Sequence, residues 1–93
     1  PVGVLLMTDE AGGDEKLIAV PVSKVFPGYD HVSNANDLGE LALARIGHFF
    51  EHYKDLEKGK WVKINGWGDA AKAKEMILEA VERYNSLPEK PHF

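Results

Sequence analysis

Residues 7–16 read Met-Thr-Asp-Glu-Ala-Gly-Gly-Asp-Glu-Lys, and the expected fold is built outward from this acidic stretch. An apolar, partly β-branched run precedes it at residues 2–7, and a second apolar run follows at residues 17–20. This pattern predicts two antiparallel strands joined by a turn. We expect the connecting loop to run from Thr8 to Glu15, which is longer than a tight two-residue hairpin.

Four carboxylates crowd this loop, and a lysine closes it. Their mutual repulsion favours a bound cation, and hard divalent cations prefer carboxylate oxygens. An acidic loop can equally be a solvated turn, and no complete metal-loop template matches it. The carboxylates belong to Asp9, Glu10, Asp14 and Glu15, and the lysine is Lys16.

An irregular connection at residues 23–36 leads to the first expected helix. Asp37 followed by Glu40 resembles a capping box, so we expect the helix to begin there and to stop at Gly59. Apolar side chains at helical spacing are expected to face the sheet. They are Leu38, Ala42, Ile46, Phe49, Tyr53 and Leu56.

The last third of the chain predicts a strand and a helix. Residues 61–64 read as a third strand, and Asn65-Gly66 is typical of a hairpin although no fourth strand follows. Asp69 is expected to cap a second helix. Its inward stripe is predicted to be Ala73, Met76, Ile77, Ala80, Val81 and Tyr84. Pro88 and Pro91 indicate a loose tail, and Trp61 and Trp67 are expected in the core.

The composition excludes several classes of function. Of the 93 residues, 44% are hydrophobic, which suffices for a modest core in one domain. A net charge of -4 without a basic stripe argues against nucleic acid as a partner. The apolar run at residues 2–7 is too short for a membrane span. The chain has no cysteine, so metal chemistry must use oxygen or imidazole, and a cytoplasmic location fits.

The predicted fold class is mainly β with helices, with about three strands and two helices. A sheet this small cannot close on itself, which favours part of a larger barrel over the alternative of a free-standing three-stranded sheet with two helices. The chain also starts at Pro1, without Met, directly at a strand. We therefore expect residues 1–93 to form a single partial domain of a longer chain.

The first helix carries a polar face beside its apolar stripe. Residues 48–52, His-Phe-Phe-Glu-His, match the His-x-x-Glu-His pattern of inverted zinc peptidases, but the third zinc ligand needs more downstream chain than remains. Arg45, His48, His52 and Asp55 share this face. Such a mixture of charges suits a contact between subunits.

Tyr53 and Lys54 follow at the end of the same helix. A phenol beside an ammonium group could bind an oxyanion, the one by a hydrogen bond and the other by charge. Alternatively, Tyr53 belongs to the core with its hydroxyl at the rim, and Lys54 is solvated.

Three longer motifs carry a family resemblance. They are Pro-Val-Gly-Val-Leu-x-Met-x-Asp-Glu-x-Gly-x-Asp-x-Lys at residues 1–16, His-Phe-Phe-Glu-x-Tyr-Lys-x-Leu-Glu at residues 48–57 and Gly-Lys-Trp-Val-Lys at residues 59–63. Together they resemble the C-terminal half of bacterial soluble inorganic pyrophosphatases. The resemblance implies a twisted five-stranded OB-like β-barrel with two outer α-helices, and Mg²⁺-dependent hydrolysis of pyrophosphate to two phosphates.

The same resemblance implies roles for individual residues. Asp9 and Asp14 match metal-binding aspartates of the family, and Lys16 matches its active-site lysine. Tyr53 and Lys54 match the pair that binds phosphate oxygens. The chemistry is coherent, because magnesium prefers carboxylate oxygens and phosphoryl transfer needs charge stabilisation on the phosphate.

The resemblance also implies an assembly and sets a limit. The face with His48, His52 and Asp55 resembles the contact through which bacterial members form hexamers. The family's Asp-Gly-Asp-Pro-x-Asp segment, which supplies further metal ligands, is absent from these residues. We therefore expect the isolated chain to be nearly inactive and poorly folded. Glu10 and Glu15 are expected to be solvated neighbours. The alternative is a non-catalytic barrel fragment that serves as an oligomerisation or binding module.

Overall fold

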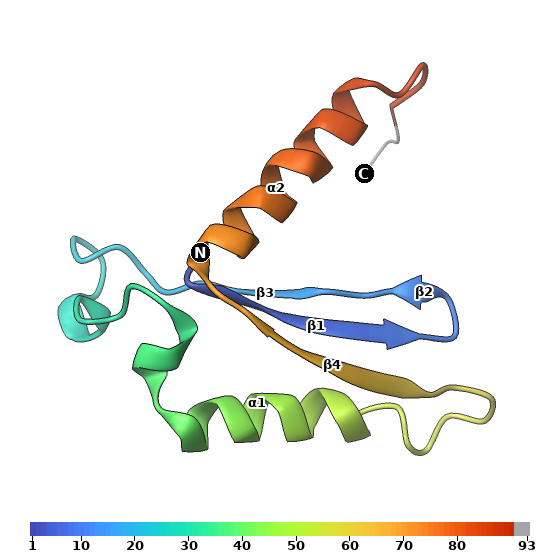
Figure 1. Ribbon diagram of the computed structural model, residues 1–93, viewed down its shortest axis with the longest axis horizontal. Coiled ribbons are helices and arrows are strands. Elements are labelled where there is room, and N and C mark those ends of the chain that lie inside the picture. Colours follow the sequence, from blue (N-terminus) through green and yellow to red (C-terminus); the bar gives the residue numbers. More distant parts are fainter. Residues whose placement is uncertain (91–93) are drawn as a thin grey trace.

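One antiparallel sheet organises the chain, with β1 at its centre (Figure 1). The computed structural model describes residues 1–90. Its strands are β1 (Gly3–Asp9), β2 (Gly12–Gly13), β3 (Lys16–Ile18) and β4 (Val62–Gly68); its helices are η1 (Pro27–Tyr29), η2 (Ala35–Leu38), α1 (Glu40–His52) and α2 (Ala70–Asn85). The predicted class, mainly β with two α-helices, is confirmed. Within the described residues the sheet is open, and the barrel expected for the family is not closed.

The acidic stretch forms a tight hairpin. β1 pairs with β2 and then β3 in one continuous antiparallel register, in which Asp9 lies opposite Gly12. Glu10 and Ala11 alone form the turn, and Gly12 has a φ of 116°, a value that side chains disfavour. The predicted long loop from Thr8 to Glu15 is therefore wrong. Of the four acidic residues only Glu10 lies in the turn, because Asp9 ends β1 and residues 14–15 lie between β2 and β3.

The two faces of the sheet contact different helices, because successive side chains of a strand point to opposite sides. Leu5, Met7 and Asp9 share the face that lies against α1. Val4 lies on the other face, where an added Cβ on its partner Gly68 would meet both Val4 and the side chain of Lys72 in α2. The buried apolar side chains are those of Val2, Val4, Leu5, Met7, Val32, Ala35 and Ala73.

The expected third strand is longer than predicted and contains a β-bulge. β4 pairs with β1 along its whole length, but the register shifts where Leu6 lies opposite Gly66 and Met7 lies opposite Ile64. Asn65 is the extra residue, and Gly66 has a φ of 132°. The Asn-Gly pair that is typical of hairpins therefore bends a continuous strand in this protein.

α1 has different ends from those predicted. Asp37 does not cap it; its carboxylate closes η2 by accepting two backbone N–H groups from the preceding turn, at 2.9 and 3.0 Å. α1 begins after Gly39 without a side-chain cap, and it ends at His52 rather than at Gly59. A turn-rich segment then connects the helix to β4.

The early end of α1 changes its buried stripe. Ala42 and Ile46 are half-buried as predicted, but Phe49 is 59% exposed and Leu56 is fully exposed. Phe50 takes the inward position instead. The helical spacing failed at Leu56 because that residue lies beyond the helix.

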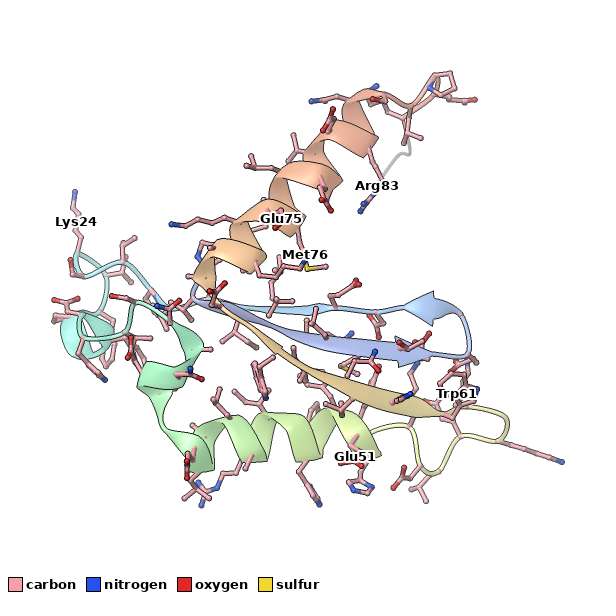
Figure 2. The ribbon with its side chains drawn as sticks, in the orientation of Figure 1. Lys24, Glu51, Trp61, Glu75, Met76 and Arg83 are labelled. Carbon is pink, nitrogen blue, oxygen red and sulfur yellow. The ribbon has the colours of Figure 1, made fainter. Side chains whose placement is uncertain are left out.

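α2 begins as predicted and then extends away from the sheet (Figure 1). The Asp69 side chain accepts the Lys72 N–H at 2.9 Å and caps the helix. Ala73 is buried, and the half-buried Met76 lies between α2 and the sheet (Figure 2). Farther along, Val81 is exposed, as are Ala80 and Tyr84, so the second half of the predicted stripe has no partner within the described residues.

The chain as a whole is open. Its radius of gyration is 15.3 Å, compared with about 12 Å for a compact domain of this length. Trp67 is half-buried, but Trp61 is 51% exposed beside the hairpin end of the sheet (Figure 2), so its predicted core position is wrong. Pro88 lies after α2 as expected, whereas Pro91 lies outside the described residues.

Candidate metal and phosphate site

Asp9 is the buried polar residue at the end of β1. Its side chain is 9% exposed and both carboxylate oxygens have partners. Oδ2 accepts a hydrogen bond from Lys54 Nζ at 2.8 Å, and Oδ1 accepts one from the Ala11 N–H at 2.9 Å. The Lys54 ammonium first, and the Ala11 amide second, lower the pKa of Asp9. The carboxylate is therefore held ionised in a fixed orientation.

Lys54 reaches Asp9 from the turn just after α1. Its side chain is 16% exposed, and the hydrogen bond to Asp9 is the main reason why its pKa lies above the ordinary value. Tyr53 precedes it with 40% exposure, and the Lys54 ammonium lies 5.6 Å from the centre of the Tyr53 ring. The early end of α1 thus places the phenol and the ammonium over the end of the hairpin.

Asp14 and Lys16 lie on the same face of the sheet as Asp9. The Asp14 N–H donates to the Met7 carbonyl at 3.0 Å, and Lys16 pairs with Leu5, so both side chains share the face of their buried partners. Lys16 Nζ is 3.1 Å from Asp14 Oδ1 and 5.4 Å from the centre of the Phe50 ring of α1. This lysine therefore bridges the hairpin and the helix.

Glu10 was expected to be a solvated neighbour; the residue is exposed, but its carboxylate also pairs with two lysines. Its Oε1 lies 3.2 Å from Lys60 Nζ and 3.6 Å from Lys54 Nζ, and its Oε2 accepts the Trp61 N–H at 3.4 Å. Its own backbone N–H, with Lys60 and Trp61 as further contributors, lowers the pKa of Glu10. The sequence does carry one signal for this contact. The segment between α1 and β4 is rich in lysine and must return past the hairpin to reach β4.

The structure thus brings together all five residues predicted for the metal and phosphate site. They come from the hairpin and from the end of α1, and they are Asp9, Asp14, Lys16, Tyr53 and Lys54. Two ammonium groups neutralise the two aspartates, and the rings of Phe50 and Tyr53 lie beside Lys16.

The donor chemistry of this site fits Mg²⁺, but the coordination sphere is incomplete. The ionised, buried carboxylate of Asp9 and the nearby carboxylate of Asp14 are hard oxygen ligands of the kind that Mg²⁺ prefers. Among residues 1–90, however, no three His, Cys, Asp or Glu side chains gather in a metal-binding arrangement. These aspartates would therefore supply part of a shell that needs water, phosphate or further ligands.

The predicted interface residues form a separate surface at the end of α1 and in the turn that follows it. The His48 and His52 rings lie 4.5 Å apart between their centres, and His52 Nδ1 is 2.8 Å from Asp55 Oδ2. All three side chains are exposed. Within residues 1–90 these side chains do not form a group of three that could hold a metal, as a zinc peptidase would require.

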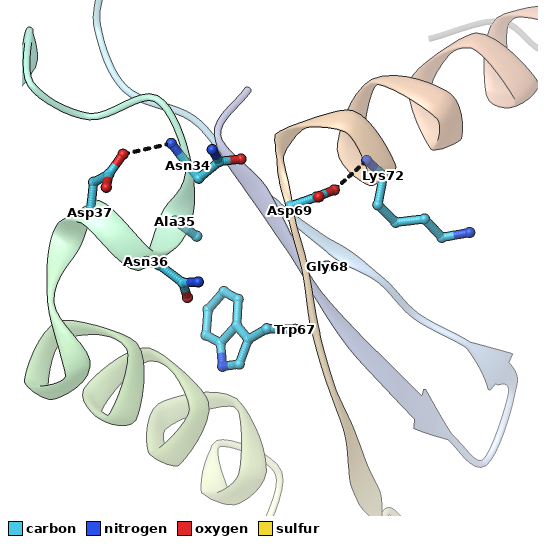
Figure 3. A pocket seen from close by; sticks show the side chains of 8 residues that line it. All are labelled: Asn34, Ala35, Asn36, Asp37, Trp67, Gly68, Asp69 and Lys72. Atoms are coloured by element: carbon cyan, nitrogen blue, oxygen red, sulfur yellow. Dashed lines mark hydrogen bonds between the residues drawn. The ribbon is translucent and has the colours of Figure 1, made fainter.

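A pocket of about 650 Å³ lies at the opposite end of β1 and β4, between η2 and the start of α2 (Figure 3). Three of its polar side chains accept hydrogen bonds from the backbone. Asn34 Oδ1 accepts the Ala70 N–H at 2.9 Å, and the carboxylates of Asp37 and Asp69 accept backbone amides. We assign this pocket a structural role, because its side chains join η2 to the N-terminus of α2.

The fold and the site together define a class of protein. An antiparallel sheet flanked by helices presents two aspartates and two lysines at one end. There the aspartates could bind a divalent cation while the lysines bind a polyanion beside it.

Comparison with known proteins identifies this class. The sequence profile described as inorganic pyrophosphatase matches residues 1–85, so the chain belongs to the inorganic pyrophosphatase family. The inorganic pyrophosphatase of Xanthomonas axonopodis pv. citri is 64% identical over 86 residues, which cover 92% of this chain and 48% of that protein. The inorganic pyrophosphatase of Escherichia coli K12 is 64% identical over 83 residues, covering 89% and 47% respectively.

Solved structures agree with this assignment. An inorganic pyrophosphatase from Helicobacter pylori superimposes with a TM-score of 0.89 at 46% identity, over 91% of this chain and 50% of that one. The Thermus thermophilus inorganic pyrophosphatase gives a TM-score of 0.85 at 45% identity, over 91% and 49%. The chain therefore spans about half the length of the curated relatives that it matches. No helix within residues 1–90 is long and apolar enough to cross a membrane.

Proposed function

We propose that the protein containing this chain, at the full length of its relatives, is a Mg²⁺-dependent inorganic pyrophosphatase that hydrolyses pyrophosphate to two phosphates. Membership of the family supports this function. The structural observation that carries it is the 2.8 Å contact between Lys54 and Asp9, which joins the phosphate-binding pair to the metal-binding hairpin.

In the proposed reaction a water oxygen bonds to one phosphorus, the bridging P–O bond breaks, and the bridging oxygen leaves with the second phosphate. Bound Mg²⁺ would screen the charge of pyrophosphate and lower the pKa of a bound water. Asp9 and Asp14 would hold the metal. Lys16, Tyr53 and Lys54 would stabilise negative charge on phosphate oxygens as the bond breaks.

The same proposal includes a homohexamer in the cytoplasm. The exposed surface of His48, His52 and Asp55 supports a contact between subunits, since imidazoles with a carboxylate at 2.8 Å present both charge and aromatic area. A chain without cysteine is compatible with a reducing compartment. Neither nucleic acid nor membrane is proposed as a partner, and the small-molecule partners are pyrophosphate and phosphate.

A second candidate is a non-catalytic module that uses only the helix surface. The incomplete metal shell among residues 1–90 favours it for the isolated chain. Phosphate release from magnesium pyrophosphate separates the candidates: we expect activity in the full-length protein and nearly none in the 93-residue chain. Activity of the isolated chain at the full-length rate would contradict this division, and an inactive full-length protein would favour the module.

The metal role is tested in the full-length protein by Asp14→Asn, with Glu15→Gln as the control. Both changes remove one carboxylate from the same hairpin, but Glu15 is exposed whereas Asp14 contacts Lys16. We expect Asp14→Asn to raise the Mg²⁺ concentration for half-maximal activity on the order of tenfold. An equal response of the two variants would exclude Asp14 as a ligand.

A further inference from the structure

Glu10 connects the hairpin turn to two of the three lysines between α1 and β4, Lys54 and Lys60. Lys54 and Lys60 approach the same oxygen, Oε1, at 3.6 and 3.2 Å, while Oε2 accepts the backbone N–H of Trp61. The Glu10 side chain is 25% exposed. A glutamate at the tip of a two-residue turn is thereby fixed to the segment between α1 and β4.

Binding of a metal at Asp9 creates a conflict for Lys54. The Lys54 ammonium lies 2.8 Å from Asp9 Oδ2, and a divalent cation on this carboxylate would repel the ammonium strongly. Lys54 must then move away from Asp9. Within residues 1–90 it has a second carboxylate inside ion-pair distance, which is that of Glu10.

We propose that Glu10 is a positioning residue, which receives the Lys54 ammonium when Asp9 binds a divalent cation. Glu10 thereby keeps Lys54 beside the site, available for the phosphate, while it releases Asp9 for the metal. This inference rests on the proposed function, because it takes Asp9 as a metal ligand.

Lys60 opposes the transfer of the Lys54 ammonium from Asp9 to Glu10. It shares Oε1 with Lys54 and lies closer to it, so it partly neutralises Glu10 and weakens the attraction for Lys54. Its side chain is 45% exposed, so water screens this pair more than the buried contact between Lys54 and Asp9. Loss of Lys60 should therefore make Glu10 a better acceptor and strengthen metal binding at Asp9.

The test measures Mg²⁺ binding directly, by isothermal titration calorimetry on the full-length protein without substrate. We expect Glu10→Gln to weaken binding about fivefold, the effect of one unit charge at about 4 Å in water. Glu15→Gln removes the same charge from the exposed side of the hairpin and should change binding less than about twofold. Thermal unfolding monitors the fold, and Glu10→Asp provides a milder variant should Glu10→Gln unfold.

A double-mutant cycle with Lys54→Met separates positioning from simple charge. If Glu10 acts by receiving Lys54, Glu10→Gln should have almost no effect once Lys54 is replaced. If Glu10 only adds negative charge near the metal, its effect persists in the Lys54→Met background, and the inference is overturned. Equal effects of Glu10→Gln and Glu15→Gln would overturn it as well.

Two further variants complete the design. Lys60→Gln should tighten Mg²⁺ binding relative to Lys58→Gln, a neighbouring change of equal charge, and equal affinities would exclude the role of Lys60. Asp9→Asn should weaken binding more than Glu10→Gln does. Unchanged binding in Asp9→Asn would overturn the proposed metal ligand and this inference together, whereas a strong Asp9 effect without an Lys54-dependent Glu10 effect would overturn the inference alone.

Discussion

The Lys54 ammonium lies within ion-pair distance of two carboxylates, and the two contacts differ in length and in exposure to water. Asp9 Oδ2 lies 2.8 Å from Lys54 Nζ, and the Asp9 side chain is 9% exposed. Glu10 Oε1 lies 3.6 Å from the same nitrogen, and the Glu10 side chain is 25% exposed. Charge-assisted hydrogen bonds strengthen as they shorten and as solvent is excluded. In the absence of metal the ammonium therefore stays with Asp9 rather than with Glu10.

Tyr53→Phe tests the proposed phosphate-binding role of the Tyr53 hydroxyl. A hydrogen bond to a charged group contributes about 1.5–3 kcal/mol, so we expect kcat/KM of the full-length protein for magnesium pyrophosphate to fall roughly 10- to 100-fold. Tyr29→Phe is the matched control, because Tyr29 is 41% exposed and Tyr53 is 40% exposed, but Tyr29 lies in η1. Steady-state kinetics measures both variants. A loss of thermal stability with unchanged kcat/KM would assign Tyr53 to packing.

At the scale of elements, the sequence predicted which segments form strands and helices better than where they end. The apolar run before the acidic stretch and the Asp69 cap both identified real elements, since burial and capping are local signals. The hairpin turn and the bulge at Asn65 depend on register, which is set by pairing with β1 and cannot be found in either strand alone. The same register places Asp9, which is buried, in the strand and Glu10, which is exposed, in the turn.

Asp37 illustrates a local signal assigned to the wrong element. Its carboxylate accepts the Asn34 and Ser33 N–H groups, in that order of importance, and these bonds lower its pKa below the ordinary value of 3.8. Because the folded pKa lies below the unfolded one, the resulting stability is present above pH 3.8 and is lost as the pH falls through the folded pKa.

Asp37→Asn should remove this pH dependence. The asparagine side-chain oxygen can still accept one or both amide bonds, but it does not titrate. We expect the variant to unfold at lower temperature than the parent near pH 6, with the gap closing as the pH falls below about 3.8. Thermal unfolding across this range measures it. Asp30→Asn is the control, since the Asp30 carboxylate makes no hydrogen bond within residues 1–90, and a gap independent of pH would contradict the assignment.

The bulge in β4 makes a second prediction at this scale. Gly66 has a φ of 132°, and an added Cβ would meet no atom within 4 Å, so Gly66→Ala isolates the cost of backbone strain. We expect a loss of about 1–3 kcal/mol in the free energy of unfolding. Gly47→Ala in α1 also meets no atom within 4 Å and should instead stabilise the helix by about 0.5–1 kcal/mol. Denaturant unfolding compares them, and equal effects would argue against strain at Gly66.

At the scale of the whole molecule, the candidate site depends on a contact between distant parts of the chain. Lys54 and Asp9 are 45 residues apart, and no periodicity in the sequence places them together. The family motifs predicted that they share a site, but not that they bond to each other. The open shape is also a property of the whole molecule. The radius of gyration exceeds the compact value, and the sequence matches about half of each relative.

The exposed surface of α1 carries the last prediction, which concerns assembly. The His48 and His52 rings lie 4.5 Å apart between their centres with their planes tilted by 46°, and Asp55 Oδ2 lies 2.8 Å from His52 Nδ1, so these exposed side chains already have partners within the chain. Ordered side chains lose less entropy on association than mobile ones. Carboxylates in place of both imidazoles would put three or more like charges on one small surface and oppose its burial.

If the full-length protein forms the proposed hexamer through this surface, we expect His48→Glu with His52→Glu to yield smaller species, detected as a lower mass by sedimentation equilibrium at neutral pH. Lys74→Glu on α2 is the control, because it also shifts the net charge by two units toward negative and its side chain is exposed on another helix. The control should retain the parent mass, since net charge alone weakens association much less than charge placed inside an interface. Retention of the parent mass by the histidine variant would exclude this surface from the assembly, whereas dissociation of both variants would point to a general charge effect.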